Sequence, residues 1–278
     1  MNNKILEWNV DSVIIWITDS FPLKYYGLLF VTGLLLGHYM VKQIYRKENI
    51  PTEGLDSLLT YIAVGTILGA RLGHCLFYEP LYYIKNPIEV LLPIKKVGEG
   101  FKFIGFQGLA SHGGAIGVLI AILLYCRKNK TNLLWILDRV SIGIPITAGF
   151  IRLGNFMNSE IYGKATNGNW GVVFANNDLI PRHPTQLYEA FSYFAIFFIL
   201  KILYEKRNEQ YNGYIFGNCL ILLFSARLII EFFKENQVGF ENQMILNMGQ
   251  ILSFPFILIG ILLIIFRNKF TLQKETMG

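Results

Sequence analysis

The sequence predicts an all-α polytopic membrane protein with seven transmembrane helices, and two observations support this prediction. Hydrophobic residues make up 53% of the 278 residues, only 16% are charged, and the mean hydropathy is +0.41. An ordinary soluble domain carries about 25% charged residues. Apolar runs also recur along the chain at lengths close to the roughly 20 residues that a helix needs to cross a bilayer. We therefore expect a single integral membrane domain over residues 1–278.

Each expected helix is one of these apolar runs. The third and fourth runs contain the most glycine and polar residues, which membrane helices tolerate where they are covered by protein or line a cavity. The expected spans are Leu23 to Val41, Leu55 to Tyr78, Gly108 to Cys126, Leu133 to Phe156, Pro184 to Tyr204, Gly213 to Phe233 and Ile245 to Phe266.

The first helix is expected to remain attached to the protein. Asp11 and Asp19 flank only a short apolar stretch near the N-terminus, and no small-residue cleavage site follows it.

The distribution of Lys and Arg predicts the orientation of the helices, because these residues favour the cytoplasmic ends of membrane spans. They are denser in the segments that would face inward if the N-terminus lies outside, which predicts an N-out/C-in topology. Residues 157–183 would then form a small periplasmic head insertion.

Cysteine, histidine and charge usage give no sign of a cofactor. The three cysteines, Cys75, Cys126 and Cys219, show no C-x-x-C spacing, and the four histidines show no metal-ligand spacing. We expect the three cysteines to be buried and to pack as small hydrophobic side chains. We expect no metal site and no cofactor. The net charge of +6 and pI of 9.1 fit basic loops that meet anionic lipid headgroups, so no nucleic acid partner is expected.

Ionisable residues inside membrane spans are costly and indicate function by default. Five such residues fall in the outer portion of their helices in the N-out topology, level with Tyr26 at the start of the first helix. A shared outward-facing cavity explains this common depth, whereas the alternative is that the arginines pair with lipid phosphates at the interface. The five are Arg71, His112, Arg152, Arg227 and Glu231.

Three other ionisable residues lie near the expected cytoplasmic helix ends. Asp138, Arg139 and Lys201 can each extend toward water from such a position, as long charged side chains do near membrane surfaces. We therefore expect them to be solvated and not part of a site.

The segment RLGNFMNSE, from Arg152 to Glu160, lies where the fourth helix leaves the membrane. Arginine offers a planar fork suited to phosphate oxygens. Asn155 and Asn158 are three residues apart and can share a helical face, and Gly154 permits close approach. These residues could also cap the helix as it leaves the bilayer.

This segment resembles the signature of the prolipoprotein diacylglyceryl transferase family, and the resemblance covers nearly the whole chain. One departure is Leu223, where some family members carry a functionally important tyrosine, and the head segment is short. The other matching motifs follow in the family's order: KYYGL from Lys24, SHGGAIG from Ser111, HPTQLYE from His183, RLIIEFF from Arg227 and MGQ from Met248.

The resemblance implies an enzyme of the bacterial cytoplasmic (inner) membrane whose active site faces the periplasmic leaflet. It would transfer the diacylglyceryl group of phosphatidylglycerol to the lipobox cysteine of a prolipoprotein signal peptide, forming a thioether and releasing glycerol phosphate. This is the first step of bacterial lipoprotein maturation. The implied partners are phosphatidylglycerol, these signal peptides and the lipid bilayer.

The resemblance also implies the site residues. Arginines fit a phosphate clamp, and an imidazole with a pKa near 6.5 can accept a proton from a thiol with a pKa near 8.5. Two alternatives remain: the histidine is structural beside a Gly-x-x-x-Gly packing face of Gly113 and Gly117, and Glu231 is a plain ion-pair partner of Arg227. The implied catalytic residues are His112, Arg152, Arg227, Tyr26, Asn155, Glu160 and Glu231, and the implied phosphatidylglycerol-binding residues are Arg152, Arg227, Asn155, Gly163 and Gly114.

Two other classes of membrane protein predict different patterns of polar residues. A transporter or channel would be expected to carry polar residues through both leaflets, often with an internal repeat. The polar set here stops in the outer half of the helices. A purely structural membrane protein would need neither converging arginines nor clustered motifs.

Overall fold

The computed structural model describes residues 5–18, 21–91, 94–97, 100–103, 110–206, 212–236, 241 and 244–270. The chain divides into two compact units. The first unit comprises residues 1–44 and 137–278, and the second comprises residues 45–136. Residues 271–278, the end of the expected cytoplasmic segment 267–278, lie outside the described residues.

The described residues contain seven long helices, and each lies where the apolar runs predicted one. The ends differ by a few residues, most at the first helix, which continues beyond Val41 to Lys47. Gly108, the predicted start of the third helix, lies outside the described residues. The seven are α1 (Tyr25–Lys47), α2 (Glu53–Phe77), α5 (Ser111–Lys128), α6 (Leu133–Met157), α7 (Thr185–Lys206), α8 (Tyr214–Ile230) and α9 (Met248–Ile265).

Six of these helices are long and apolar enough to cross a membrane: α1, α2, α6, α7, α9, and α8 taken together with the 3-10 turn η1 (Glu231–Phe233). Large apolar side chains cover their outer surfaces, as at Phe198, which is 60% exposed. The remaining helix, α5, has a polar first turn and ends in Arg127 and Lys128. The chain is thus mostly helical with six membrane-competent helices, and a seventh span stays a prediction.

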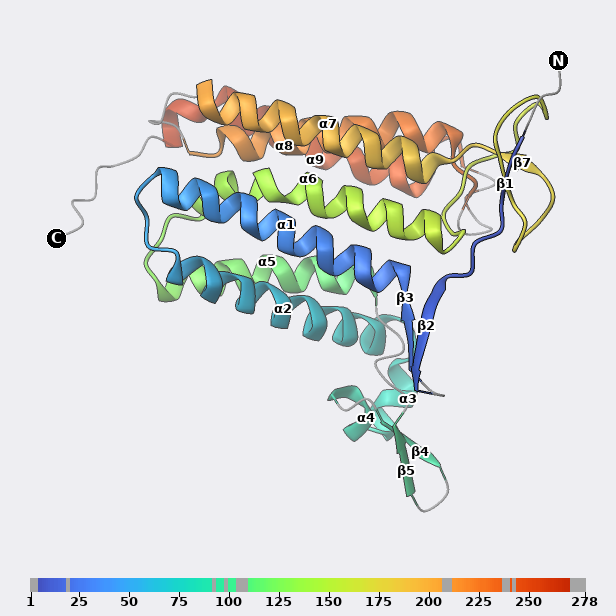
Figure 1. The fold of residues 1–278 in the computed structure, drawn as a ribbon. Coiled ribbons are helices and arrows are strands. Elements are labelled where there is room, and N and C mark those ends of the chain that lie inside the picture. The colour runs from blue at the N-terminus through green and yellow to red at the C-terminus, as the bar shows by residue number, and fades with distance from the viewer. Residues whose placement is uncertain are drawn as a thin grey trace. The chain divides into compact units, whose positions relative to one another are not determined.

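In the first unit, α1, α6, α7 and α8 share one hydrophobic core, and α9 packs on α8 (Figure 1). Thr147 Oγ1 donates a hydrogen bond to Gly33 O at 3.0 Å, and a Cβ on Gly33 would lie 2.6 Å from Cβ of Phe150. Glycine therefore allows α1 and α6 to approach closely. As Figure 1 shows, the start of α1, the end of α6 and the start of α7 lie at one end of the bundle.

Asp138, in the second turn of α6, corrects the expectation that it reaches water. It is only 1% exposed, and its carboxylate accepts hydrogen bonds from the backbone N–H groups of Gly213 and Phe216, each at 2.8 Å. The first amides of a helix have no acceptor within the helix. The carboxylate therefore caps α8 from a neighbouring helix. Arg139 is also buried, at 6% exposure, whereas Lys201 is exposed as expected.

In the second unit, glycine lets α2 and α5 pack through their backbones. Gly113 and Gly117 of α5 face Gly65, Gly69 and Gly73 of α2, and a Cβ on Gly113 would lie 2.8 Å from Cα of Gly73. Close approach of small residues is a common way for membrane helices to associate. The interpretation of Gly113 and Gly117 as a packing face is confirmed.

Short strands and helices join the long helices and were not part of the all-α prediction. β1 pairs in parallel with β6, which pairs antiparallel with β7, and this sheet links the N-terminal segment to the α6–α7 connection. β2 and β3 form one antiparallel pair, and β4 and β5 form another. The elements are β1 (Leu6–Trp8), β2 (Val13–Thr18), β3 (Phe21–Lys24), α3 (Pro80–Lys85), α4 (Ile88–Leu91), β4 (Ile94–Val97), β5 (Gly100–Phe103), β6 (Val172–Phe174), β7 (Pro181–Arg182) and η3 (Arg267–Phe270).

Candidate functional site

Arg152, near the end of α6, begins a chain of polar contacts at one end of the first unit. Its Nη1 donates a hydrogen bond to Asn155 Oδ1 at 3.1 Å. Asn155 is 4% exposed, and its Nδ2 donates to Glu160 Oε1 at 2.8 Å. Asn158 Nδ2 donates to the same oxygen at 3.2 Å. The structure thus connects three predicted site residues, Arg152, Asn155 and Glu160, through one amide.

The turn that carries Glu160 has an unusual backbone. Ser159 and Ile161, on either side, have φ angles of 53° and 57°, a region that is uncommon for residues with a Cβ and strained for β-branched ones. Three successive carbonyl oxygens of this turn accept side-chain hydrogen bonds, which hold it in place. The donors are Asn177 Nδ2 to Ser159 O at 2.5 Å, Gln186 Nε2 to Glu160 O at 2.8 Å and Thr185 Oγ1 to Ile161 O at 3.2 Å.

Two buried carboxylates, Glu189 and Glu231, connect Arg152 to Arg227 through Lys234. Glu189 is 0% exposed, and its Oε2 lies 2.9 Å from Arg152 Nε. Lys234 Nζ donates to Glu189 Oε1 and to Glu231 Oε1, each at 3.0 Å. Arg227 Nε lies 3.5 Å from Glu231 Oε1. We call these five side chains the charge network. The expected Arg227–Glu231 ion pair is therefore present, and it belongs to a larger arrangement.

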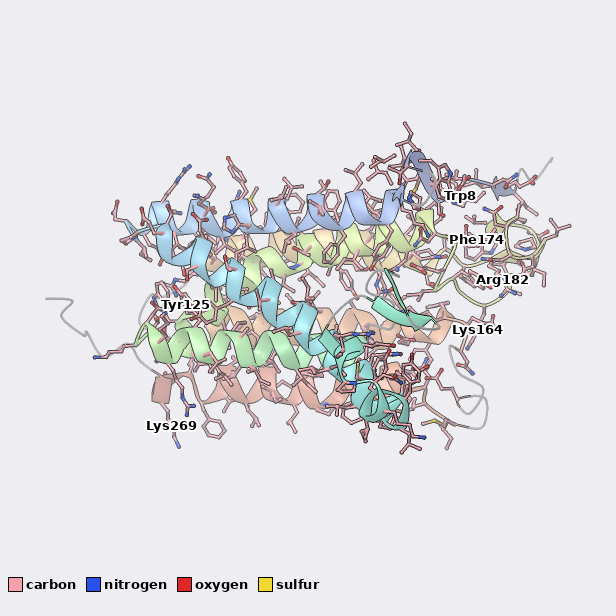
Figure 2. All side chains as sticks on the ribbon, turned by 90° about the horizontal axis from the view of Figure 1, so that it is seen from below. Trp8, Tyr125, Lys164, Phe174, Arg182 and Lys269 are labelled. Atoms are coloured by element: carbon pink, nitrogen blue, oxygen red, sulfur yellow. The ribbon has the colours of Figure 1, made fainter. Side chains whose placement is uncertain are left out.

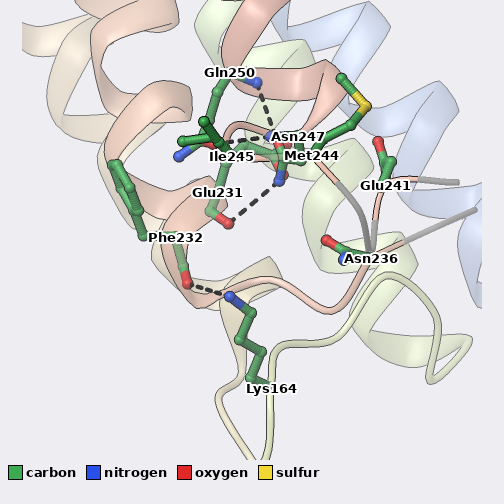
Figure 3. A pocket seen from close by; sticks show the side chains of 9 residues that line it. All are labelled: Lys164, Glu231, Phe232, Asn236, Glu241, Met244, Ile245, Asn247 and Gln250. Carbon is green, nitrogen blue, oxygen red and sulfur yellow. Dashed lines mark hydrogen bonds between the residues drawn. The ribbon is translucent and has the colours of Figure 1, made fainter. Parts of the chain in front are cut away.

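A pocket of about 140 Å³ lies on the other side of Glu231 (Figure 3). Asn247 Nδ2 donates to Glu231 Oε2 at 3.1 Å, and Asn247 and Gln250 form a reciprocal cap at the start of α9. Lys164 Nζ donates to the carbonyl oxygen of Phe232 at 3.0 Å. Glu231 therefore contributes one oxygen to the charge network and the other to this pocket.

Two predicted site residues are explained by close packing. Tyr26, in the first turn of α1, lies against Gly154, where a Cβ would be 2.9 Å from Cδ2 of the tyrosine ring. Gly163 lies between His183 and Phe233, and a Cβ there would be 2.6 Å from the carbonyl oxygen of Phe233. Any larger residue would displace the backbone that leads to Lys234. Gly163 would therefore influence the site through the position of the backbone, since it has no side chain to contact a ligand.

The second unit contains the other predicted residues. His112 is exposed in the first turn of α5, and Gly114 is buried, where an added Cβ would make only an ordinary contact with Ala70 of α2. Arg71, expected in the polar set, is 4% exposed; its Nη2 donates to Glu89 O at 2.5 Å and its Nε to Val90 O at 3.0 Å. Arg71 therefore anchors the segment that contains α4.

Arg182 ties together the connection between α6 and α7. Its Nη2 donates to Asp178 Oδ2 at 2.6 Å and its Nη1 to Glu235 Oε2 at 2.8 Å. The hydrogen bond from Arg182 lowers the pKa of Asp178, and burial lowers the pKa of His183. Figure 2 shows Arg182, Lys164, Trp8 and Phe174 at one end of the helices and Lys269 at the other.

Sequence reasoning missed Glu189 and Lys234 of the charge network. Glu189 ends the quoted motif HPTQLYE and is an ionisable residue in an apolar helix, the signal that selected Arg152 and Arg227. Lys234 directly follows a predicted span, where a lysine is usually solvated. Within the described parts of the chain, no group of three His, Cys, Asp or Glu side chains could hold a metal ion.

These observations define a multi-pass helical membrane protein with three cationic side chains and two buried carboxylates joined at one end of its bundle. The family described as prolipoprotein diacylglyceryl transferase matches residues 12–266. The chain belongs to this family.

Similar proteins cover nearly the full length. A phosphatidylglycerol–prolipoprotein diacylglyceryl transferase of Tolumonas auensis is 50% identical over 266 residues, which is 95% of this chain and 98% of the relative. Proteins of the same name from Bacteroides fragilis and Chloroherpeton thalassium are 46% and 42% identical. They cover 97% and 92% of this chain, and 98% and 95% of their own lengths.

Proposed function

We propose that this chain transfers the diacylglyceryl group of phosphatidylglycerol to the lipobox cysteine of a prolipoprotein signal peptide, the first step of bacterial lipoprotein maturation. Membership of the family and relatives of that name with up to 50% identity support the reaction. The structural observation that carries the proposal is the joining of Arg152 and Arg227 by buried carboxylates at one end of a membrane bundle. Two arginines there suit the phosphate of a lipid donor.

In this reaction the acceptor thiol loses its proton to a base, and the sulfur attacks the glycerol carbon that carries the phosphate. The S–C bond forms while the C–O bond breaks, and its electron pair stays on the phosphate oxygen. The products are a thioether and glycerol phosphate. Arg152 and Arg227 would stabilise the developing negative charge through charge-assisted hydrogen bonds, which are strongest where water is scarce.

The remaining roles are assigned by residue chemistry. His112 is proposed as the base, because an imidazole can accept a proton and His112 lies at the exposed start of α5. The pH–rate profile of a His112→Gln enzyme should then lose its acidic limb, and survival of that limb would assign the proton to another group. Asn155 and Glu160 would orient Arg152, Glu231 would orient Arg227, and Tyr26, Gly114 and Gly163 would shape the donor site.

The transfer itself is tested with purified protein, phosphatidylglycerol and a lipobox peptide, with thioether formation measured by mass spectrometry. A peptide with serine in place of the lipobox cysteine should give no product. The protein's own cysteines are all buried, at 3%, 6% and 1% exposure, so we expect the Cys75→Ala, Cys126→Ala, Cys219→Ala triple variant to remain active. Loss of activity in a folded Cys75→Ala enzyme, with lipid trapped on the wild-type protein, would overturn direct transfer.

We also propose seven spans, with α5 as the third, in an N-out/C-in topology in the bacterial inner membrane. The polar end of the bundle would then face the periplasmic leaflet, and the α6–α7 connection would form the periplasmic head. Arg127, Lys128 and Lys130 at the α5–α6 turn support this orientation. An alkaline phosphatase fusion at Asn176 should be active and one at Lys130 inactive, and the reverse pattern excludes the topology.

A further inference from the structure

We propose that Lys234 is a positioning residue that keeps Arg152 and Arg227 available to an anionic phosphate, by sharing the two carboxylates with which the arginines pair. The inference rests on the proposed function, because the phosphate is that of the donor lipid or of its glycerol phosphate product. It concerns a residue that would touch neither the thiol nor the phosphate.

The backbone of Lys234 is fixed before its side chain enters the charge network. Lys234 forms an isolated β-bridge with Gly163. Lys164, which follows Gly163, donates its backbone N–H to the carbonyl oxygen of Phe233, which precedes Lys234, at 2.8 Å. The lysine is 4% exposed, so its ammonium group lies in a site with little water. Burying an ammonium ion is costly unless it is paired. Two carboxylate oxygens at 3.0 Å supply that pairing.

Both arginines pair with these carboxylates, and Arg227 is held less tightly than the lysine. Arg152 Nε lies 2.9 Å from Glu189 Oε2, but that oxygen is buried without an aligned hydrogen bond from the described residues. Arg227 lies 3.5 Å from Glu231, its side chain is 36% exposed, and its Nε is buried without a hydrogen-bond partner among the described residues. Their guanidinium groups are thus oriented while retaining donor capacity for a ligand.

Lys234 shares both carboxylates with the arginines, since it binds one oxygen of each. Without its charge, Glu189 and Glu231 would face each other with only the arginines to balance them. Coulomb attraction would then draw the partly exposed Arg227 closer to Glu231, and its guanidinium donors would be directed to a carboxylate instead of a phosphate. The affinity for phosphate should fall although both arginines remain.

A pair of isosteric substitutions separates this role from a purely structural one. Lys234→Gln removes one positive charge from the network, and Glu189→Gln removes one negative charge, while each glutamine can still hydrogen-bond. The double variant restores the original charge. If the network sets phosphate affinity, the two single substitutions should act in opposite directions and the double variant should return toward wild type.

The measurement is the dissociation constant of glycerol phosphate for the full-length protein in detergent, by isothermal titration calorimetry, together with the KM for phosphatidylglycerol. We expect Lys234→Gln to weaken binding at least tenfold, Glu189→Gln to bind at least as tightly as wild type, and the double variant to lie within threefold of wild type. Lys234→Arg should also lie within threefold. Lys201→Gln is the matched control, because Lys201 is exposed and lies near the opposite end of α7 from Glu189; its effect should be below twofold.

Two outcomes overturn the proposal. The first is folded Lys234→Gln protein that binds glycerol phosphate as tightly as wild type does. The second is an equal loss of binding in Lys234→Gln and Glu189→Gln that follows their loss of thermal stability, which identifies a purely structural lysine. Failure of the proposed function is recognised separately, since wild-type protein would then form no thioether on a lipobox peptide. Opposite effects of the two single variants on glycerol phosphate binding would still support the role of Lys234 at an anion site.

Discussion

Arg152→Lys is expected to lower the rate of thioether formation at least 100-fold, although it keeps the positive charge. The guanidinium places Nε beside Glu189 and Nη1 on Asn155, and its planar fork can still present a donor to phosphate. Lysine has one ammonium group on a flexible stem and cannot keep these directions at once. Removing one preorganised donor from a site of developing negative charge costs about 10²–10³ in kcat. Initial rates with phosphatidylglycerol and a lipobox peptide measure the effect.

Arg227→Lys provides the internal comparison. Arg227 has a single, longer contact with Glu231, so its fork is less constrained and the substitution should be milder. Arg267→Lys, in the 3-10 turn η3 that follows α9, measures the effect of replacing an arginine of the first unit that lies outside the charge network. If folded Arg152→Lys enzyme transfers lipid at nearly the wild-type rate, Arg152 is not a phosphate clamp.

Asp138→Ala should destabilise the helical bundle by about 3 kcal/mol or more, the largest stability effect that we expect from a polar residue outside the charge network. The substitution removes the acceptor of two backbone hydrogen bonds, from Gly213 and Phe216, at a residue that is 1% exposed. Buried amides without an acceptor bear their full desolvation penalty. The loss of stability is measured by heating the protein in detergent and determining the fraction that remains folded by size-exclusion chromatography.

Asp138→Asn is the matched variant, because its amide oxygen can still accept from one of the two N–H groups. We expect an intermediate loss of stability and little change in the KM for phosphatidylglycerol, since this cap lies at the start of α8 and the charge network at its end. An Asp138→Ala protein with wild-type thermal stability would show that water or another group replaces the carboxylate.

The helices could be predicted from sequence because their signal is local. Each expected span is a continuous apolar run, and the structure places a long helix over every one. Arg152 and Asn155 were also accessible, since residues three apart share a helical face and the structure joins their side chains. The spacing of Gly113 and Gly117 had also offered a packing face as an alternative interpretation, and α2 provides the matching glycines.

What sequence could not provide are contacts between distant segments. Glu189 meets Lys234 across 45 positions, and Asp138 meets Gly213 across 75, so neither pairing leaves a local pattern. Asp138 was expected in water because the rule for charges near helix ends uses depth alone and ignores backbone donors on neighbouring helices. Similarly, β1 could not be anticipated, because its partner strand β6 follows only after α6.

The left-handed turn at Ser159 and Ile161 bears on when, during biogenesis, this protein becomes able to catalyse its reaction. That backbone is held by Asn177, from the connection before α7, and by Thr185 and Gln186 at the start of α7. These groups come together only after the chain beyond α6 has been synthesised and packed. A molecule with inserted helices but a loose connection would span the bilayer and yet leave the Glu160 carboxylate without a fixed direction. The turn thus makes competence a late event in biogenesis, separate from insertion into the membrane.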